Sequence, residues 1–250
     1  MQVGLIGAGN MARAMALGWG RPVLVCDALP ERAHALATET GGEALATNAE
    51  VAQRADLVLL CHKPPGLAAV AAEVAPHAKA VASILGGVPL AELKAAYPDR
   101  PVYRLLPSTP VAVRQGAVIL AADDEQDATL DADVRALMAE LGTLVELPDA
   151  LVDVAMGLMS NAPAYYALVA EAQIDAGVRR GLTPDQAARL VVQTMAGTAE
   201  LLKQAEFDTL AVRRAVTSPG GSTARGLDAL ERGGVRAAFS DALDAILSSE

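Results

Sequence analysis

The fold is decided by VGLIGAGNMA, the stretch at residues 3–12 near the start of the 250-residue chain. The segment Val3–Ile6 reads as a short apolar strand, and the small residues that come after the stretch predict a helix. Between strand and helix lie Gly7, Gly9 and Ala12, in the spacing G-x-G-x-x-A. In a strand–turn–helix setting this spacing is typical of turns that bind a dinucleotide.

Each small residue of this turn has a physical role. Gly7 allows the tight turn, Gly9 lets the backbone approach a pyrophosphate, and Ala12 lets the helix lie close to the strand. The helix start adds free N–H groups and a partial positive charge, so Asn10 and Met11 join the predicted cofactor residues. A purely structural glycine turn is the alternative, and the setting between strand and helix favours cofactor binding.

Composition restricts the class of protein. Hydrophobic residues make up 52% of the chain and aromatic residues 3%, which predicts a soluble enzyme with a core rich in Ala, Val and Leu. The formal net charge of −10 argues against a nucleic-acid partner, because nothing would neutralise the backbone phosphates. The N-terminus is already strand-like and shows no signal peptide, and the longest uncharged run, residues 154–170, is too short and polar for a membrane span. We therefore expect a cytoplasmic protein.

The two cysteines, Cys26 and Cys61, stand at the ends of predicted strands and are interpreted as small buried hydrophobic residues. No Cys or His spacing suits a metal, because the side chains of the neighbours Cys61 and His62 point to opposite faces of a strand. We therefore expect no metal site. His62 could act as an acid or base, but a loop residue beside the cofactor is the favoured interpretation.

Asp27 ends the second predicted strand, Val23–Cys26, near the usual spacing for the acid that accepts the ribose hydroxyls of a dinucleotide. It could instead cap the helix that begins at Pro30. A carboxylate here repels a 2′-phosphate and so favours NADH over NADPH, although Arg32 lies close enough to act in the opposite direction.

Strands and helices alternate up to residue 149. Lys63 and Pro64 follow the strand 56–61, at the carboxyl edge where open α/β sheets bind ligands, and both are predicted cofactor residues. The other predicted strands are 43–46, 80–84, 102–106, 116–121 and 143–147, and the helices between them are 30–39, 49–54, 67–75, 90–97 and 131–141, the last stopped by Gly142. This alternation predicts a Rossmann-like, doubly wound, mostly parallel sheet in an N-terminal domain, residues 1–149.

Residues 150–250 show helical patterns only and form the second predicted domain. A long helix begins at Asn161 and ends before Gly181, and Thr183 opens another with a capping box. Further helices are predicted at 209–216, 224–232 and 235–247. The helix after Thr183 places its apolar stripe on one face: Ala187, Leu190, Val191, Thr194, Thr198, Leu201 and Leu202. Thin, Ala-rich helices cannot bury such a surface alone, so we expect packing against a second subunit.

The segment Ser218–Thr223, SPGGST, is a second candidate anion site. Two glycines, Gly220 and Gly221, let the backbone approach a ligand closely. The N–H groups of Gly221, Ser222 and Thr223 open a helix and are free to bind a carboxylate. A capping loop is the alternative, and the presence of a nucleotide turn in the same chain favours the anion site.

The residues Val216–Thr223, followed by Leu227 and Leu230-Glu231, are similar to the signature of the pyrroline-5-carboxylate reductase family. Other matches to the family follow in order: Gly7–Met11, Lys63-Pro64, Arg104, Pro107, Thr109-Pro110, Pro163–Tyr165, Glu171-Ala172, Asp175, Gly177, Gly181-Leu182, Gln193-Thr194 and Gly197. The resemblance covers nearly the whole chain. Met159–Ala162 replaces a Ser/Gly-rich run of the family, and Ser222 replaces a common threonine. Ala28 stands where family members often carry an arginine for a 2′-phosphate, which again favours NADH.

The resemblance implies reduction of 1-pyrroline-5-carboxylate to L-proline by hydride transfer from NAD(P)H, the last step of proline biosynthesis. It implies a homodimer, or a higher oligomer, formed through the C-terminal helices. Gly220, Gly221, Ser222 and Thr223 would bind the substrate, with the Thr223 hydroxyl at the ring nitrogen. Ser222, Thr223 and Glu206 are the catalytic candidates, the last by its resemblance to a family acid at a similar distance from Ser218.

Three other functions are weighed. A β-hydroxyacid dehydrogenase would need a lysine on the first long helix of the second domain, and no lysine lies between Lys94 and Lys203. A reductase of a related cyclic imine fits the same residues. A non-catalytic NAD(P)-binding regulatory protein is the third alternative, suggested by the altered stretch Met159–Ala162.

Overall fold

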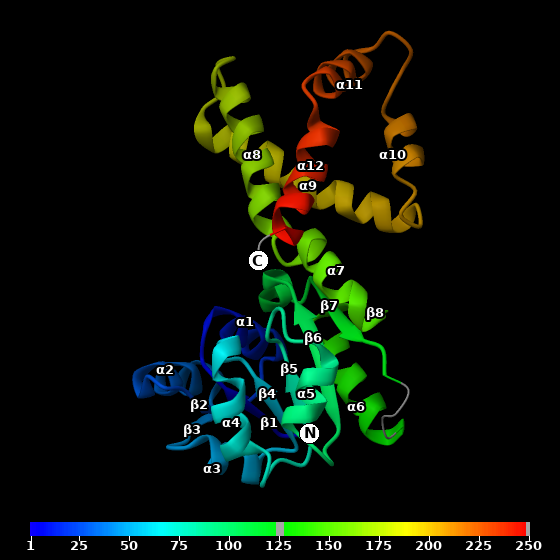
Figure 1. Cartoon of the computed structure of the whole chain (residues 1–250). Helices are drawn as coiled ribbons and strands as arrows, with labels where there is room; N and C mark the ends of the chain where they lie inside the picture. The colour runs from blue at the N-terminus through cyan, green and yellow to red at the C-terminus, as the bar shows by residue number, and fades with distance from the viewer. Residues whose placement is uncertain (124–127, 249–250) are drawn as a thin grey trace. The chain divides into compact units, whose positions relative to one another are not determined.

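The computed structural model describes residues 1–123 and 128–248. The chain forms two compact units, Met1–Pro163 and Ala164–Glu250. The first unit is built on an eight-stranded sheet, in the order β3-β2-β1-β4-β5-β6-β7-β8 (Figure 1). Its strands are β1 Val3–Ile6, β2 Leu24–Cys26, β3 Glu43–Ala44, β4 Leu57–Leu60, β5 Val81–Ser83, β6 Val102–Pro107, β7 Gly116–Ala121 and β8 Gly142–Leu147.

The sheet confirms the predicted mostly parallel architecture. Strands β1 to β6 are all parallel to one another, β7 is antiparallel to β6, and β8 is parallel to β7. The reversal occurs because the chain between β6 and β7 has no long crossover helix, only the short 3₁₀ segment η2, Thr109–Val113. Arg114, in the left-handed region with φ +58°, then turns the chain back.

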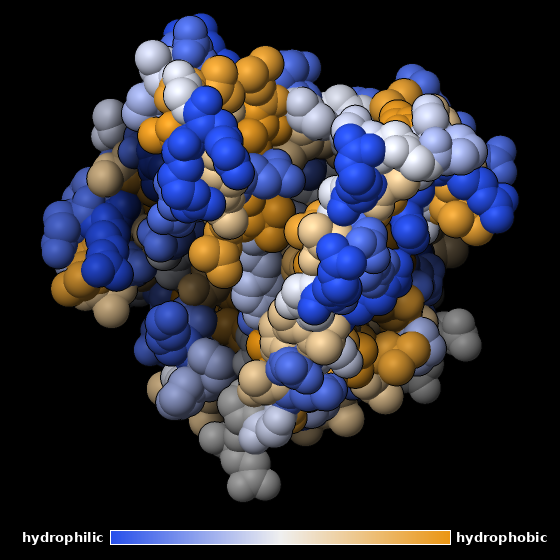
Figure 2. Space-filling view, turned by 90° about the horizontal axis from the view of Figure 1, so that it is seen from above, coloured by the Kyte–Doolittle hydropathy of each residue, from blue (hydrophilic) through white to orange (hydrophobic). Residues whose placement is uncertain are grey.

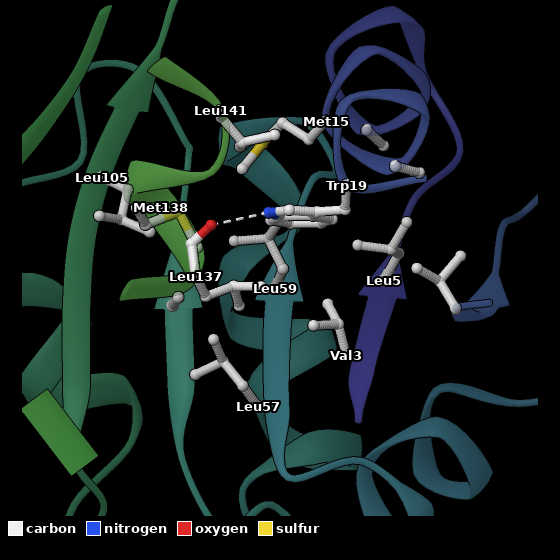
Figure 3. Close-up of a cluster of buried hydrophobic side chains, with 14 of the residues drawn as sticks. Val3, Leu5, Met15, Trp19, Leu57, Leu59, Leu105, Leu137, Met138 and Leu141 are labelled. Atoms are coloured by element: carbon white, nitrogen blue, oxygen red, sulfur yellow. Dashed lines mark hydrogen bonds between the residues drawn. The ribbon is translucent and has the colours of Figure 1, made fainter. Parts of the chain in front are cut away.

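Helices cover both faces of the sheet (Figure 1). One face carries α1 (Asn10–Trp19), α2 (Pro30–Thr40) and α6 (Ala128–Ala139). The other carries α3 (Asn48–Arg54), α4 (Leu67–Val74) and α5 (Leu90–Ala96). Figure 3 shows the core of the first face, where the Trp19 indole lies among leucines and methionines and donates a hydrogen bond of 2.9 Å to the Leu137 carbonyl. This bond satisfies the one polar atom of the buried indole.

Close packing of α1 depends on Gly18. A Cβ at this position would lie 2.2 Å from the Val111 carbonyl oxygen and 2.7 Å from a methyl group of Leu141. Only a residue without a side chain therefore lets α1 contact η2, and the glycine-turn helix is held in place by that contact.

Two features differ from the sequence-based expectation. Gly142 does not stop the preceding helix, which ends at Ala139; it begins β8 and lies directly against Gly116 of β7. An additional helix, α7 (Val152–Met159), precedes the long helix predicted from Asn161. Helix α7 packs on β6 and β7 through Leu106, Ile119, Ala121 and Val152, within the compact unit that ends at Pro163.

The regular elements in the described residues of the second unit are all helices. Its helices are α8 Ala162–Val178, α9 Pro184–Gln204, α10 Thr209–Ala215, α11 Ser222–Arg232 and α12 Val235–Leu247. The predicted capping box of Thr183 is present, with the Thr183 and Gln186 side chains each bonded to the other's backbone N–H.

This second unit has almost no interior. Among residues 164–248, Ala187 is the single buried hydrophobic residue. Large apolar side chains remain exposed, including Leu190 at 60%, Leu201 at 50% and Phe239 at 45%. In the view from above, apolar surface lies in several patches between hydrophilic residues (Figure 2). Because this unit buries so little apolar area, we expect it to be stabilised by packing against the surface of another molecule.

Candidate functional site

The ends of β1, β2 and β4 are joined by hydrogen bonds at the glycine turn. The Gly7 N–H donates to the Cys26 carbonyl at 2.7 Å, and the Cys61 N–H donates to the Ile6 carbonyl at 2.8 Å. Gly7 has φ +108°, and a Cβ there would lie 2.8 Å from the Cys61 carbonyl group and 3.0 Å from the His62 nitrogen. Glycine is thus required both by the backbone conformation and by the approach of β4, and the turn meets the loop that begins at Cys61.

The start of α1 is open to a ligand. Gly9 is the N-cap of α1, and no side chain caps the helix. A Cβ built on Gly9 would have no atom within 4 Å, so the backbone here faces free space. The N–H groups of the first helical turn, which begins at Asn10 and Met11, have no intrahelical acceptor and carry the positive end of the helix dipole. These are the requirements of a pyrophosphate site.

Asp27 lies beside this turn. Its Oδ2 accepts the Ala8 N–H at 2.6 Å, and its Oδ1 accepts the Leu29 N–H at 2.8 Å. Leu29, not Asp27, is the N-cap of α2, so the alternative of a helix cap is wrong. A carboxylate has about four acceptor positions. Asp27 can therefore brace the turn and still accept hydrogen bonds from ribose hydroxyls.

Two cavities adjoin the glycine turn within the first unit. The larger, about 560 Å³, extends towards α2 and α3 and is lined by Ile6, Gly7, Gly9, Cys26, Asp27, Ala28, Pro30, Arg32, Ala46, Thr47, Asn48, Cys61, His62, Lys63, Val70 and Glu73. The second, about 400 Å³, extends towards β5, β6 and α7 and is lined by Gly9, Asn10, Met11, Ala12, Cys61, His62, Lys63, Pro64, Ile84, Leu85, Gly86, Leu106, Pro107, Met156 and Ser160. They share Gly9, Cys61, His62 and Lys63. All seven predicted cofactor residues line one or both cavities: Gly7, Gly9, Asn10, Met11, Asp27, Lys63 and Pro64.

Several lining residues were not among the predictions. Thr47, Asn48 and Glu73 line the cavity of Asp27, and the Asn48 amide donates to the Glu73 carboxylate at 3.0 Å. A signal for Thr47 exists, because Thr47 and Glu50 have capping-box spacing and form that box at the start of α3. Met156 comes from α7, which had no local sequence signal, and Ser160 follows that helix in the stretch Met159–Ala162, where the chain departs from the family pattern.

Burial shifts the pKa of three side chains around the turn, those of Cys26, Cys61 and His62. Burial raises the pKa of the Cys61 thiol, and burial together with the Asp27 charge raises the pKa of Cys26. Burial lowers the pKa of His62, whose Nδ1 lies 2.8 Å from the Lys63 carbonyl. The His62 Nε2 is buried without a hydrogen-bond partner among the described residues. A neutral ring fits a loop residue beside the cofactor better than a proton donor. In residues 1–123 and 128–248, no group of three or more His, Cys, Asp or Glu side chains could hold a metal.

The second candidate anion site, Ser218–Thr223, lies in the second unit. Ser218–Gly221 forms a turn in which Gly220 has φ +68° and the Gly221 N–H donates to the Ser218 carbonyl at 3.0 Å. Gly221 is the N-cap of α11 without a side-chain cap, so the N–H groups of Ser222 and Thr223 are available. The expectation that the Gly221 N–H is also free is wrong, because the turn uses it. Ser222 and Thr223 are exposed. The Arg225 guanidinium, which the sequence analysis did not single out, donates to the Gly220 carbonyl at 2.7 Å and braces the turn.

Glu206 lies at the end of α9, exposed and with φ +52°. Among the described residues, no hydrogen bond or ion pair joins its carboxylate to Ser218–Thr223. Its catalytic role stays a prediction, as do the roles of Ser222 and Thr223.

Family models divide the chain near the predicted domain boundary. Residues 149–250 match the model described as pyrroline-5-carboxylate reductase dimerisation. Residues 2–87 match the model described as NADP oxidoreductase, coenzyme F420-dependent. A pyrroline-5-carboxylate reductase of Thermus thermophilus is 38% identical over 253 residues, which cover 98% of this chain and 95% of that protein. The chain belongs to the pyrroline-5-carboxylate reductase family.

Other members of the family agree along the full length. The pyrroline-5-carboxylate reductase of Pseudomonas aeruginosa is 34% identical, with 98% of this chain and 93% of that protein covered. The crystal structure of Plasmodium falciparum pyrroline carboxylate reductase with NADP bound superimposes with a TM-score of 0.87 at 25% identity, covering 98% of this chain and 95% of that one. The protein is thus an oxidoreductase of the NAD(P)-dependent type, and its dimerisation domain marks a homo-oligomer. Among its described helices, none has the length and apolar character to cross a bilayer.

Proposed function

We propose that this chain reduces 1-pyrroline-5-carboxylate to L-proline with NAD(P)H. The observation that carries the proposal is the full-length match to proteins of that name, which includes both glycine-rich turns. The first turn fits a dinucleotide because Gly9 faces free space at an uncapped helix start, with two adjoining cavities. The second turn offers a further uncapped helix start, suited to the substrate carboxylate.

The residues of the first unit divide between the parts of the dinucleotide. The N–H groups at the start of α1 would bind the pyrophosphate, and Asp27 the adenosine ribose. The cavity beside Pro64, Leu106 and Met156 lies on the opposite side of the turn from Asp27 and would hold the nicotinamide. When bound, the reduced nicotinamide supplies the hydride that attacks the imine carbon.

The second unit would bind and orient the imine. The N–H groups of Ser222 and Thr223 bind the carboxylate, whose negative charge is stabilised by the positive end of the helix dipole, while the Gly221 N–H is used within the turn. The Thr223 hydroxyl donates a hydrogen bond to the ring nitrogen and holds the imine in one orientation. A threonine is too weak an acid to protonate the nitrogen alone, so water relays the proton, with Glu206 as a candidate donor.

For the cofactor, we propose a preference for NADH over NADPH. The Asp27 carboxylate lines the larger cavity, where a 2′-phosphate would bring a second negative charge. Ala28 lines the same cavity without a charge, and Arg32 and Lys63 are the positive side chains there. The balance favours NADH because Asp27 is already aligned by its two backbone hydrogen bonds.

For the assembly, we propose a homodimer formed through the C-terminal helices. The support is the exposed apolar stripe of α9 in a unit with one buried hydrophobic residue among those described. The domain boundary at residue 149 and the cytoplasmic location stay predictions.

One spectrophotometric assay tests the activity. Oxidation of NADH and NADPH is followed with 1-pyrroline-5-carboxylate, with other cyclic imines and with 2-keto acids. We expect turnover with 1-pyrroline-5-carboxylate and higher kcat/KM with NADH. Faster turnover of another cyclic imine would favour the related-reductase alternative. Cofactor binding without turnover of any substrate would favour the regulatory alternative.

A further inference from the structure

Arg104 is a buried charge outside the cavities. Among residues 1–123 and 128–248, the buried polar side chains are Ser83, Arg104 and Ser108, and Arg104 alone of these is charged. Its side chain is 3% exposed. A guanidinium taken out of water needs partners that replace its hydration, since an unpaired buried charge is strongly destabilising. The partners of Arg104 therefore show which parts of the fold its charge joins.

The partners of Arg104 come from the segment that leads into α7. Arg104, on β6, donates through Nη1 to Asp149 Oδ1 at 2.8 Å and through Nη2 to Asp153 Oδ1 at 2.7 Å. Asp149 Oδ2 also accepts the N–H of Leu90, the first residue of α5, at 3.2 Å. One guanidinium thus joins β6, the first turn of α7 and the start of α5.

The elements joined by Arg104 form one wall of the smaller cavity. α7 contributes Met156 to the lining, Ser160 follows directly after α7, and the turn before α5 contributes Ile84–Gly86. The two segments meet, because a Cβ on Gly86 would lie 3.9 Å from the Met156 sulfur. Arg104 itself does not line the cavity. Its effect on a ligand there must pass through the placement of these segments.

The apolar contacts of α7 do not determine its position alone. Val152 packs with Leu106, Ile119 and Ala121 in a small cluster. Hydrophobic contact is non-directional, so it permits the helix to slide or rotate. Two ion pairs from one planar guanidinium are directional and allow a single arrangement.

We infer that Arg104 is a positioning residue for hydride transfer, which sets the nicotinamide end of the cavity by holding α7 through Asp149 and Asp153. The inference rests on the proposed function, because that function places the nicotinamide in this cavity. Misplacement of reacting groups by about 1 Å can cost on the order of 100-fold in rate.

The test compares Arg104→Met with the matched control Arg135→Met. Arg135 also pairs with two carboxylates, Asp131 and Glu146, but joins α6 to β8 and lines neither cavity. For each full-length variant, kcat is measured with saturating imine and NADH, and the Kd of ADP-ribose reports the adenosine half alone. We expect Arg104→Met to lower kcat at least about tenfold while the Kd of ADP-ribose changes less than about twofold, and Arg135→Met to change neither beyond about twofold.

Arg104→Lys should recover part of the kcat, since a lysine reaches one carboxylate but not both. An equal loss of kcat in the Arg104→Met and Arg135→Met variants, or loss of ADP-ribose affinity that matches the loss of kcat, would overturn the inference. If Arg104→Met does not fold, the kcat values of Arg104→Lys and Asp153→Asn are the test, and unchanged kcat in both variants rejects the positioning role.

If the wild type turns over no imine, the proposed function fails. The inference is then decided by whether Arg104→Met weakens binding of NADH but not of ADP-ribose; equal weakening, or none, overturns it.

Discussion

Asp27 holds two backbone N–H groups and keeps free lone pairs towards the larger cavity. We predict that Asp27→Ala weakens NADH more than NADPH, because it removes both the ribose acceptor and the repulsion of a 2′-phosphate. The loss for NADH should be about 1.5–3 kcal/mol, the range for hydrogen bonds to a charged group. Steady-state kcat/KM with each cofactor measures it.

Asp27→Asn is the control for this prediction. The amide keeps a carbonyl acceptor for the turn but lacks the charge, so it should lose less NADH affinity than the alanine variant. An alanine variant that loses more NADPH than NADH affinity would refute the ribose role of Asp27.

The exposed Thr223 opens α11. Thr223→Ala should keep cofactor affinity and lower kcat/KM by about 1–3 kcal/mol, the cost of leaving a ligand group unpaired. The control is Thr217→Ala, whose hydroxyl donates to the Arg213 carbonyl at 2.6 Å and so is used within the chain. Equal kinetics of the Thr223 variant and the wild type would remove Thr223 from the mechanism.

His62 makes the stability of the fold depend on pH. Burial lowers its pKa in the folded protein below the ordinary 6.5, so between the two values the unfolded state binds more protons. The stability contributed by the neutral ring is complete above pH 6.5 and is lost as the pH falls through the folded-state pKa. We expect His62→Gln to flatten the dependence of Tm on pH between about 8 and 5.5, around the usual histidine range.

The control for His62 is His34→Gln, which replaces an exposed histidine. Thermal unfolding at one protein concentration checks both variants. A His62 variant with the same pH profile as the wild type would show that the ring does not contribute in this range.

At the scale of elements, α1 is placed by a contact that admits no side chain. Gly18→Ala would bring a methyl group to 2.2 Å from the Val111 carbonyl oxygen, so α1 must move away from η2. We expect a loss of about 1–3 kcal/mol in unfolding free energy, as for other overpacked sites. Urea unfolding measures it.

The control on the same helix is Arg13→Ala, which removes an exposed ion pair with Glu39. Surface pairs of this kind contribute about 0–1 kcal/mol. If the two variants had the same unfolding free energy, the contact with η2 would not limit the position of α1.

The element patterns show why some helices were predictable and one was not. Thr183 and Gln186 carry a complete capping signal, and α9 begins where that signal predicts. α7 begins after Leu151 with no side-chain cap, and most of it falls in an uncharged run where apolar periodicity is unclear. Its existence depends on packing against β6 and β7, which no local pattern encodes.

For the molecule as a whole, the contrast between its two units predicts assembly. The first unit has an extensive core on both sheet faces, whereas residues 164–248 bury one hydrophobic residue, Ala187. Leu190→Glu combined with Leu201→Glu places two charges in the exposed apolar stripe of α9. We expect the mass measured by light scattering to fall to that of the monomer, with a lower Tm, because buried charges without partners are costly.

Arg189→Ala provides the control for assembly. This exposed residue pairs with Asp185 on the same helix, and its removal should leave the native mass unchanged. A native mass for the double Leu variant would place the subunit contact elsewhere.

The sequence by itself determined the elements whose signals are local. The glycine turn, the alternating strands and helices and the Ser218–Thr223 helix start depend on backbone conformation and short-range periodicity, which neighbouring residues encode. Only the tertiary structure decided which distant residues share a cavity. It brought Thr47, Glu73 and Met156 to the glycine turn, and it buried Arg104 between two aspartates some forty-five or more residues away. The physical reason is that these contacts depend on how the sheet stacks its layers, and packing free energy belongs to that whole arrangement.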